Sequence, residues 1–180
     1  MRVLVPIANG CEEMEAVIII DTLRRAEIDV TTAGLSAGIV EASRGVKFAP
    51  DTTWDQINPN DFDALVLPGG VGGTMALCEH GGVQQALRDF DAKGKWIGAI
   101  CAAALVLNAA GILVGKKFTC YPGVEENLPS DVQPVDTDVV VDGHLITSQG
   151  PGTAFEFALK LIAECRCPNI AATVRAGLLL

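Results

Sequence analysis

Positive charge, aromatic residues and histidine are all scarce in this 180-residue sequence. Lysine and arginine number 13 against 22 aspartates and glutamates, which gives a net charge of −9. Because nucleic acids and anionic membranes repel an acidic surface, neither is an expected partner. No apolar run approaches the roughly 18 residues of a membrane span, and the first residues lack the apolar region of a secretion signal. We therefore expect a cytoplasmic protein.

The spacings typical of metal sites are also missing. The six cysteines, at positions 11, 78, 101, 120, 165 and 167, contain no C-x-x-C pair. The two histidines, His80 and His144, have no ligand-like spacing to them. We expect no metal site, and thiols that stay reduced rather than a disulfide framework.

Apolar residues, in contrast, are plentiful, at 49% of the chain, which suits a single domain over residues 1–180 with a sizeable core. Near-continuous apolar runs alternate with helical periodicity, and this alternation predicts an α/β fold with a mostly parallel sheet covered by helices on both faces. The expected strands are Arg2–Ile7, Asp29–Ala33, Val46–Phe48, Asp63–Leu67, Trp96–Ile100, Val139–Val141 and Leu145–Thr147. The expected helices are Glu13–Ala26, Val83–Ala92, Ala102–Ala110 and Thr153–Glu164, the last opened by a Thr153–Glu156 capping box.

Cys101 stands where an apolar strand meets a small-residue helix with no glycine or proline between them. Such a junction requires a tight turn, like the nucleophile elbow of hydrolases with sulfur in place of oxygen. The first-turn N–H groups and the helix dipole would point at the sulfur and lower the pKa of the thiol. The alternative is an inert buried cysteine, and this segment alone leaves the two readings about equal.

Two further loops lie at the carboxyl ends of predicted strands, where ligands bind in parallel sheets. The glycine-rich segment 68–73 can bring N–H groups to a developing oxyanion, although its glycine content alone favours a plain strand-ending turn. The other loop carries Glu12, Glu13 and Glu15. The first two suit a helix N-terminus, whereas Glu15 lies a turn further in, where a buried carboxyl would have a raised pKa. The residues alone do not select Glu15 over its neighbours.

Several stretches together resemble the ThiJ/PfpI superfamily, and within it the subgroup of the Parkinson's-associated protein deglycase and its bacterial relatives. They are GCEEMEAV (10–17), LRRAEIDVTTAGL (23–35), SRGVKFAPD (43–51), LVLPGG (65–70), AICAA (99–103) and SQGPGTAFEFALKLI (148–162). The resemblance covers nearly the whole chain and implies a flavodoxin-like sandwich that forms a homodimer.

The resemblance also implies roles for particular residues. Cys101 matches the reactive cysteine, and Glu15 matches a protonated glutamate that hydrogen-bonds its sulfur. Gly70 and Ala102 match the backbone donors of the oxyanion site, with Pro151 and Gly152 nearby. Arg25 and Arg44 match arginines near the site and the dimer interface, although ordinary surface ion pairs explain them equally well.

The segment Phe118–Pro122 departs from the family pattern. Some members have a histidine beside the cysteine, and Tyr121 stands at that position here. A phenol, with an ordinary pKa of about 10, is a poor base at neutral pH, so a Cys–His dyad and proteolysis are disfavoured. Cys120, next to Tyr121, is best explained as a buried thiol.

The resemblance implies an enzyme of small carbonyl substrates. It would convert 2-oxoaldehydes such as methylglyoxal and glyoxal, free or as early adducts, to 2-hydroxy acids, as glyoxalase III and deglycases do, with no cofactor. The alternative is a redox-sensing stress protein or holdase chaperone that acts through oxidation of Cys101. Both readings use the same pocket, so turnover is needed to separate them.

Overall fold

The computed structural model describes residues 1–180, and its framework is a seven-stranded sheet in the order β5-β2-β1-β6-β7-β9-β8. Every neighbouring pair is parallel except β8 and β9, which are consecutive in the chain and form an antiparallel hairpin. The sheet strands are β1 (Arg2–Ile7), β2 (Asp29–Gly34), β5 (Thr52–Thr53), β6 (Ala64–Leu67), β7 (Trp96–Ile100), β8 (Val139–Asp142) and β9 (Leu145–Ser148).

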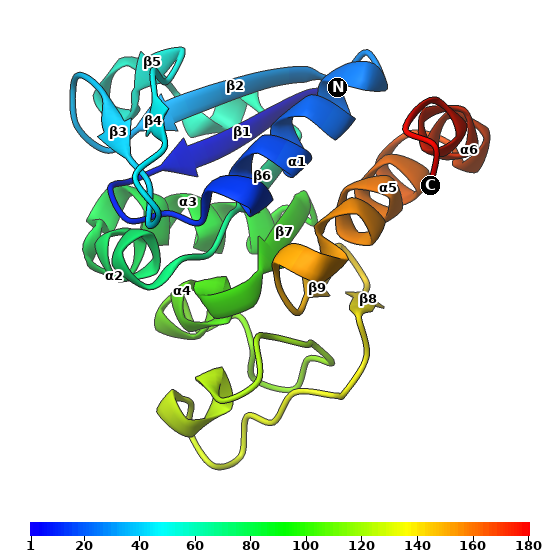
Figure 1. Cartoon of the computed structure of the whole chain (residues 1–180). Coiled ribbons are helices and arrows are strands. Elements are labelled where there is room, and N and C mark those ends of the chain that lie inside the picture. The colour runs from blue at the N-terminus through cyan, green and yellow to red at the C-terminus, as the bar shows by residue number, and fades with distance from the viewer.

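Helices cover both faces of the sheet, so the predicted α/β sandwich is confirmed (Figure 1). On one face lie α1 (Glu13–Arg25), α5 (Ala154–Cys165) and α6 (Pro168–Gly177). On the other lie α2 (Val71–Glu79), α3 (Gly81–Ala92) and α4 (Ala104–Ala109). Each face has its own buried apolar cluster, with 22 and 25 residues respectively, so the sheet is sealed from water on both sides. No helix combines the length and the hydropathy needed to cross a membrane.

Several elements differ from the sequence prediction. Helices α2 (Val71–Glu79) and α6 (Pro168–Gly177) were not predicted; the first opens in a glycine-rich segment, and the second begins at Pro168. The expected strand Val46–Phe48 is reduced to β4 (Lys47–Phe48), which pairs only with β3 (Val40–Glu41) in a separate antiparallel ribbon.

The predicted capping box of α5 is wrong. A turn of 3₁₀ helix, Pro151–Thr153, precedes α5, and the Thr153 hydroxyl accepts the Gly150 N–H at 3.1 Å instead of capping α5. The Glu156 carboxylate pairs with Arg175 of α6 rather than reaching back to the helix start. Tertiary contacts with the next helix therefore displaced a local motif.

Candidate active site

Cys101 lies directly after β7, on the turn into α4, as the elbow prediction required. Its φ is +63°, in the left-handed region that non-glycine residues rarely adopt. One turn of 3₁₀ helix, Cys101–Ala103, then leads into α4. Backbone strain of this kind persists only where the surrounding structure holds it, and such positions cluster at functional sites.

Glu15 enters the site from α1 and is fully buried. Its Oε2 accepts the Gly69 N–H at 2.7 Å, whereas its Oε1 is buried without a hydrogen bond to nitrogen or oxygen. The carboxyl interacts directly with the Cys101 thiol. Gly69 permits this contact, because a Cβ there would lie 2.7 Å from Cys101 Cβ and 2.8 Å from Glu15 Oε2.

Burial dominates the electrostatics of this pair. It raises the pKa of Glu15 from 4.5 to about 7, against the lowering effect of the Gly69 N–H. Burial, and after it the negative charge of ionised Glu15, together raise the pKa of Cys101 from 9.0 to about 12. The expectation that the elbow lowers the pKa of Cys101 overall was therefore wrong, because desolvation and the nearby carboxylate outweigh the N–H groups. When Glu15 is protonated, its negative charge no longer raises the pKa of Cys101.

Two backbone N–H groups, those of Ala102 and Gly70, hydrogen-bond the Cys101 sulfur and lower its pKa. Gly70 has a φ of +88°, and a Cβ on it would lie 2.4 Å from the backbone nitrogen of Glu12. Only glycine fits there, and α2 begins at the next residue. The glycine-rich segment is therefore a strand-ending turn that continues into a helix N-terminus beside the sulfur.

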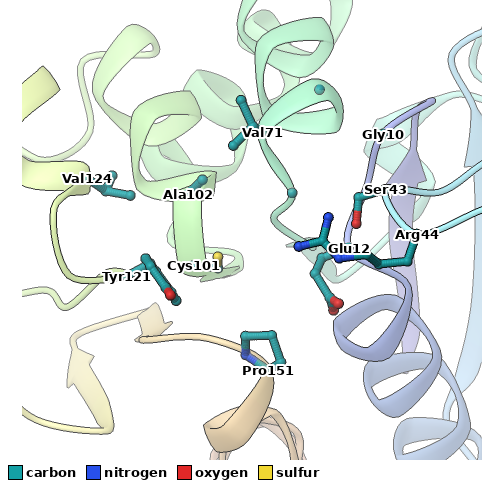
Figure 2. Close-up of a pocket in the computed structure, with 12 residues that line it drawn as sticks. Gly10, Glu12, Ser43, Arg44, Val71, Cys101, Ala102, Tyr121, Val124 and Pro151 are labelled. Atoms are coloured by element: carbon teal, nitrogen blue, oxygen red, sulfur yellow. The ribbon is translucent and has the colours of Figure 1, made fainter.

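The Cys101 sulfur borders a cavity of about 500 Å³ at the carboxyl ends of the strands (Figure 2). Its walls differ in character. Glu12, Ser43 and Arg44 form a polar side, whereas the opposite side is apolar, with Cys101 between them. The lining residues are Gly10, Glu12, Ser43, Arg44, Gly70, Val71, Gly72, Cys101, Ala102, Tyr121, Val124 and Pro151.

Comparison with known proteins bears on what such a site does. Residues 1–164 match the DJ-1/PfpI family. The chain belongs to this family. Protein dj-1beta of Drosophila melanogaster is 47% identical over 178 residues, 98% of this chain and 95% of the relative. Its crystal structure superposes with a TM-score of 0.95 and covers 99% of this chain and 97% of its own, so the flavodoxin-like fold is confirmed.

Two other members of the DJ-1/PfpI family carry informative names. Glutathione-independent glyoxalase DJR-1.2 of Caenorhabditis elegans is 35% identical over 162 residues, 89% of this chain and 86% of the relative. A structure described as Toxoplasma gondii DJ-1, oxidized, is 39% identical, with a TM-score of 0.93 and coverage of 99% of this chain and 97% of that chain. These names state an activity and a chemical state for those proteins.

Not every residue singled out in the sequence reaches the site of this DJ-1/PfpI protein. Tyr121 and Arg44 line the cavity, but Gly152 does not, and Pro151 beside it takes that place. Arg25 lies ten residues beyond Glu15 on α1, about 15 Å along the helix, and pairs with Asp21 at 2.7 Å. For Arg25 the ordinary ion-pair reading is therefore the one that the structure supports.

Sequence reasoning singled out Arg44 in the loop after β3 but missed Ser43 beside it and the part that Glu13 plays in placing both residues. Ser43 and Arg44 reach the cavity because Glu13 holds them there. Its carboxylate accepts the Ser43 hydroxyl and the Arg44 backbone N–H, each at 2.8 Å. Desolvation opposes the charge on Glu13, but these and other hydrogen bonds outweigh it and keep its pKa below the usual value. Glu12 caps α1 by accepting the Glu15 N–H at 2.7 Å. The three acidic residues therefore have different roles: Glu12 caps the helix, Glu13 holds the loop after β3, and Glu15 contacts Cys101.

No group of three or more histidine, cysteine, aspartate or glutamate side chains is arranged to hold a metal ion. Cys11 and Cys120 are both buried, and burial raises their pKa values to about 12 and about 11. Neither lines the cavity that Cys101 borders. The buried-thiol reading of Cys120 agrees with this placement.

Proposed function

We propose that this protein is a cofactor-free, cysteine-dependent glyoxalase that converts 2-oxoaldehydes to 2-hydroxy acids. The observation that carries the proposal is the contact between a buried glutamate of raised pKa and a cysteine sulfur that opens into a cavity. This pairing supplies a nucleophile and a proton carrier with no other group. The name of the Caenorhabditis elegans relative supports the same activity.

The reaction begins when the Cys101 thiolate attacks the aldehyde carbon and forms a carbon–sulfur bond. The aldehyde oxygen becomes an oxyanion, which the N–H groups of Gly70 and Ala102 stabilise because they already point at the sulfur. Glu15 gives its proton to this oxygen, and the product is a hemithioacetal.

Glu15, now a carboxylate, removes the proton from the former aldehyde carbon and returns it to the neighbouring carbonyl carbon, while the hydroxyl proton of the hemithioacetal passes to the oxygen of that neighbouring carbonyl. The product is the thioester of a 2-hydroxy acid on Cys101. Water then cleaves the thioester, which releases the acid and restores the thiol. One water is consumed, and no electrons are exchanged with an external partner.

Lactate release from methylglyoxal in the absence of glutathione tests the proposal. Wild type should release lactate repeatedly, and Cys101→Ser should release none above background. Cys78→Ser is the matched control, because Cys78 is half-buried on α2 and does not line the cavity. Full activity in Cys101→Ser would overturn the proposal. Parallel assays with pre-formed protein and nucleotide adducts distinguish direct deglycation from scavenging of free aldehyde.

A second candidate is a redox-sensing stress protein, or a holdase chaperone, that responds through Cys101. The name of the oxidised Toxoplasma gondii relative favours it, as do the two N–H groups and Glu15, which could hold a sulfinate. Peroxide should then add two oxygen atoms to Cys101 before any other cysteine, as read by mass spectrometry. A sensor without lactate turnover would establish this candidate over the glyoxalase.

A further inference from the structure

The cavity beside Cys101 is larger than the smallest 2-oxoaldehydes require. Its volume of about 500 Å³ lies in the range of sites that enclose drug-sized ligands, whereas methylglyoxal has three carbons. The space beyond the sulfur must therefore hold either water or a substituent of the substrate. Which of the two it favours depends on the residues of the walls.

One wall of the cavity is apolar and half-open to solvent. Val71 is 77% exposed and Tyr121 is 51% exposed, and Val124 and Pro151 complete this side (Figure 2). Large apolar side chains that stay exposed at a pocket mark it as a place for apolar ligands. The opposite wall, with Glu12, Ser43 and Arg44, would lose hydration if an apolar group covered it.

Tyr121 is held in place beside the sulfur. Its backbone N–H donates to the Cys101 carbonyl at 3.4 Å, so its position is tied to the elbow. Its ring packs on Gly150, where a Cβ would lie only 3.0 Å from Tyr121 Cδ2. The Tyr121 ring therefore has a fixed position, unlike a flexible side chain on the surface.

We propose that Tyr121 recognises the substituent of the 2-oxoaldehyde, and that the substrates of this protein include aryl and other bulky apolar 2-oxoaldehydes. The inference rests on the proposed function. The reacting carbons lie at Cys101, and the substituent lies over the Tyr121 ring, toward Val124. An aromatic pair contributes about a tenfold preference at most, so the effect is one of specificity rather than of chemistry. Tyr121 is thus a specificity residue in a position where some relatives place a histidine.

The test compares initial rates with phenylglyoxal and with glyoxal, because phenylglyoxal also modifies arginine on longer exposure. The quantity of interest is the ratio of the two kcat/KM values. Wild type should prefer phenylglyoxal, and Tyr121→Ala should lower the ratio about tenfold. Tyr121→Phe should keep it, because the ring remains. Gly150→Ala, whose backbone is extended and accepts any residue, should lower it by displacing the ring.

Val114→Ala is the control, because Val114 is 71% exposed and lies outside the cavity. An unchanged ratio in Tyr121→Ala, or no wild-type preference, would overturn the inference and leave the glyoxalase proposal intact. Absence of turnover with every 2-oxoaldehyde would instead refute the glyoxalase. In that case calorimetry decides the role of Tyr121. If wild type binds mandelate more tightly than lactate and Tyr121→Ala loses this difference, the role of Tyr121 is supported. If wild type binds the two acids equally, that role is overturned.

Discussion

At the residue scale, the protonation of Glu15 and the protonation of Cys101 are coupled, because the two side chains are in contact. Glu15 is fully buried and Cys101 is half-buried, and the negative charge of ionised Glu15 raises the pKa of Cys101. Two such groups titrate as a pair, and the first proton leaves at a pKa of about 7. The resulting single charge is productive when it lies on sulfur and the remaining proton lies on Glu15.

This coupling predicts the pH profile of turnover. The value of kcat/KM should rise with pH through about 7, where the pair loses its first proton, and then level off. In Glu15→Gln the Coulombic penalty on sulfur is absent, so thiolate absorbance near 240 nm should appear at a lower pH than in wild type. Lactate release should nevertheless be lost, because an amide carries no proton between the two carbons.

Glu15→Asp provides the conservative comparison and should weaken both the thiolate signal and turnover, because its carboxyl reaches less far. Full turnover in Glu15→Gln would remove Glu15 as the proton carrier. Tyr121 or water would then be the remaining candidates.

The buried carboxyl of Glu15 also couples stability to pH. A pKa raised from 4.5 to about 7 means that its contribution to stability is fully present below pH 4.5 and is lost as pH rises through 7. The loss amounts to roughly 3 kcal/mol. Glu15→Gln has no such loss, so its free energy of unfolding relative to wild type should rise by about that amount between pH 4.5 and pH 8. Urea unfolding at both pH values measures it, and a constant difference contradicts it.

The segment that joins β6 to α2 shows what glycine does at the scale of elements. Gly69 lets Glu15 and Cys101 meet, and Gly70 lets the chain pass beside the loop after β1. In both places the missing side chain makes room for contacts between segments far apart in sequence. The segment between β6 and α2 also supplies the Gly70 N–H group at the Cys101 sulfur.

Gly70→Ala therefore combines two costs. The left-handed backbone costs an alanine roughly 1–2 kcal/mol, and the overlap with Glu12 and Gly10 adds roughly 1–3 kcal/mol of overpacking. Gly38→Ala is the matched control, because Gly38 has a φ of +99° but no heavy atom within 4 Å of the added Cβ. We expect urea unfolding to show the larger loss for Gly70→Ala, and turnover to fall only in that variant. Equal losses of unfolding free energy in the two variants would show that only the left-handed backbone, and not the overlap with Glu12 and Gly10, destabilises Gly70→Ala.

The surface of the whole molecule has apolar residues that a second copy could cover. Met14 is 56% exposed and Val17 is 48% exposed on α1, and Val46 near the β3–β4 ribbon is 47% exposed. Neighbouring exposed apolar side chains of this kind are typical of interaction surfaces. The family resemblance that led us to expect a homodimer points the same way.

Light scattering at micromolar concentration should therefore give about twice the chain mass of 18.8 kDa. Met14→Glu combined with Val17→Glu should shift the mass toward that of one chain, because charges would be buried without partners. Val114→Glu, at an exposed site elsewhere, should leave the mass unchanged. A single-chain mass for wild type at all concentrations would refute the homodimer.

The elements with strong local signals were predictable. The core strands β1, β6 and β7 and the amphipathic helices α1, α3 and α5 lie close to their expected bounds, because apolar periodicity reflects which face each element buries. Helix α2 was not predictable from the sequence, because its first turn contains glycines and its position depends on packing against α3 and α4. The capping box of α5 failed because the preceding 3₁₀ turn used the Thr153 hydroxyl.

The sequence by itself determined the alternation of strands and helices and the elbow at Cys101, because both depend on residues adjacent in the chain. Only the tertiary structure selected Glu15 among three glutamates and separated Arg44 from Arg25. It also reversed the expected pKa direction of Cys101. The selection of Glu15 and the pKa of Cys101 depend on burial and on contacts between distant segments, such as the Gly69–Glu15 hydrogen bond across 54 positions. Arg44 reaches the cavity through its contact with Glu13, 31 positions away, whereas Arg25 pairs with Asp21 on its own helix. Desolvation acts only after the sheet and its helices have closed over the site.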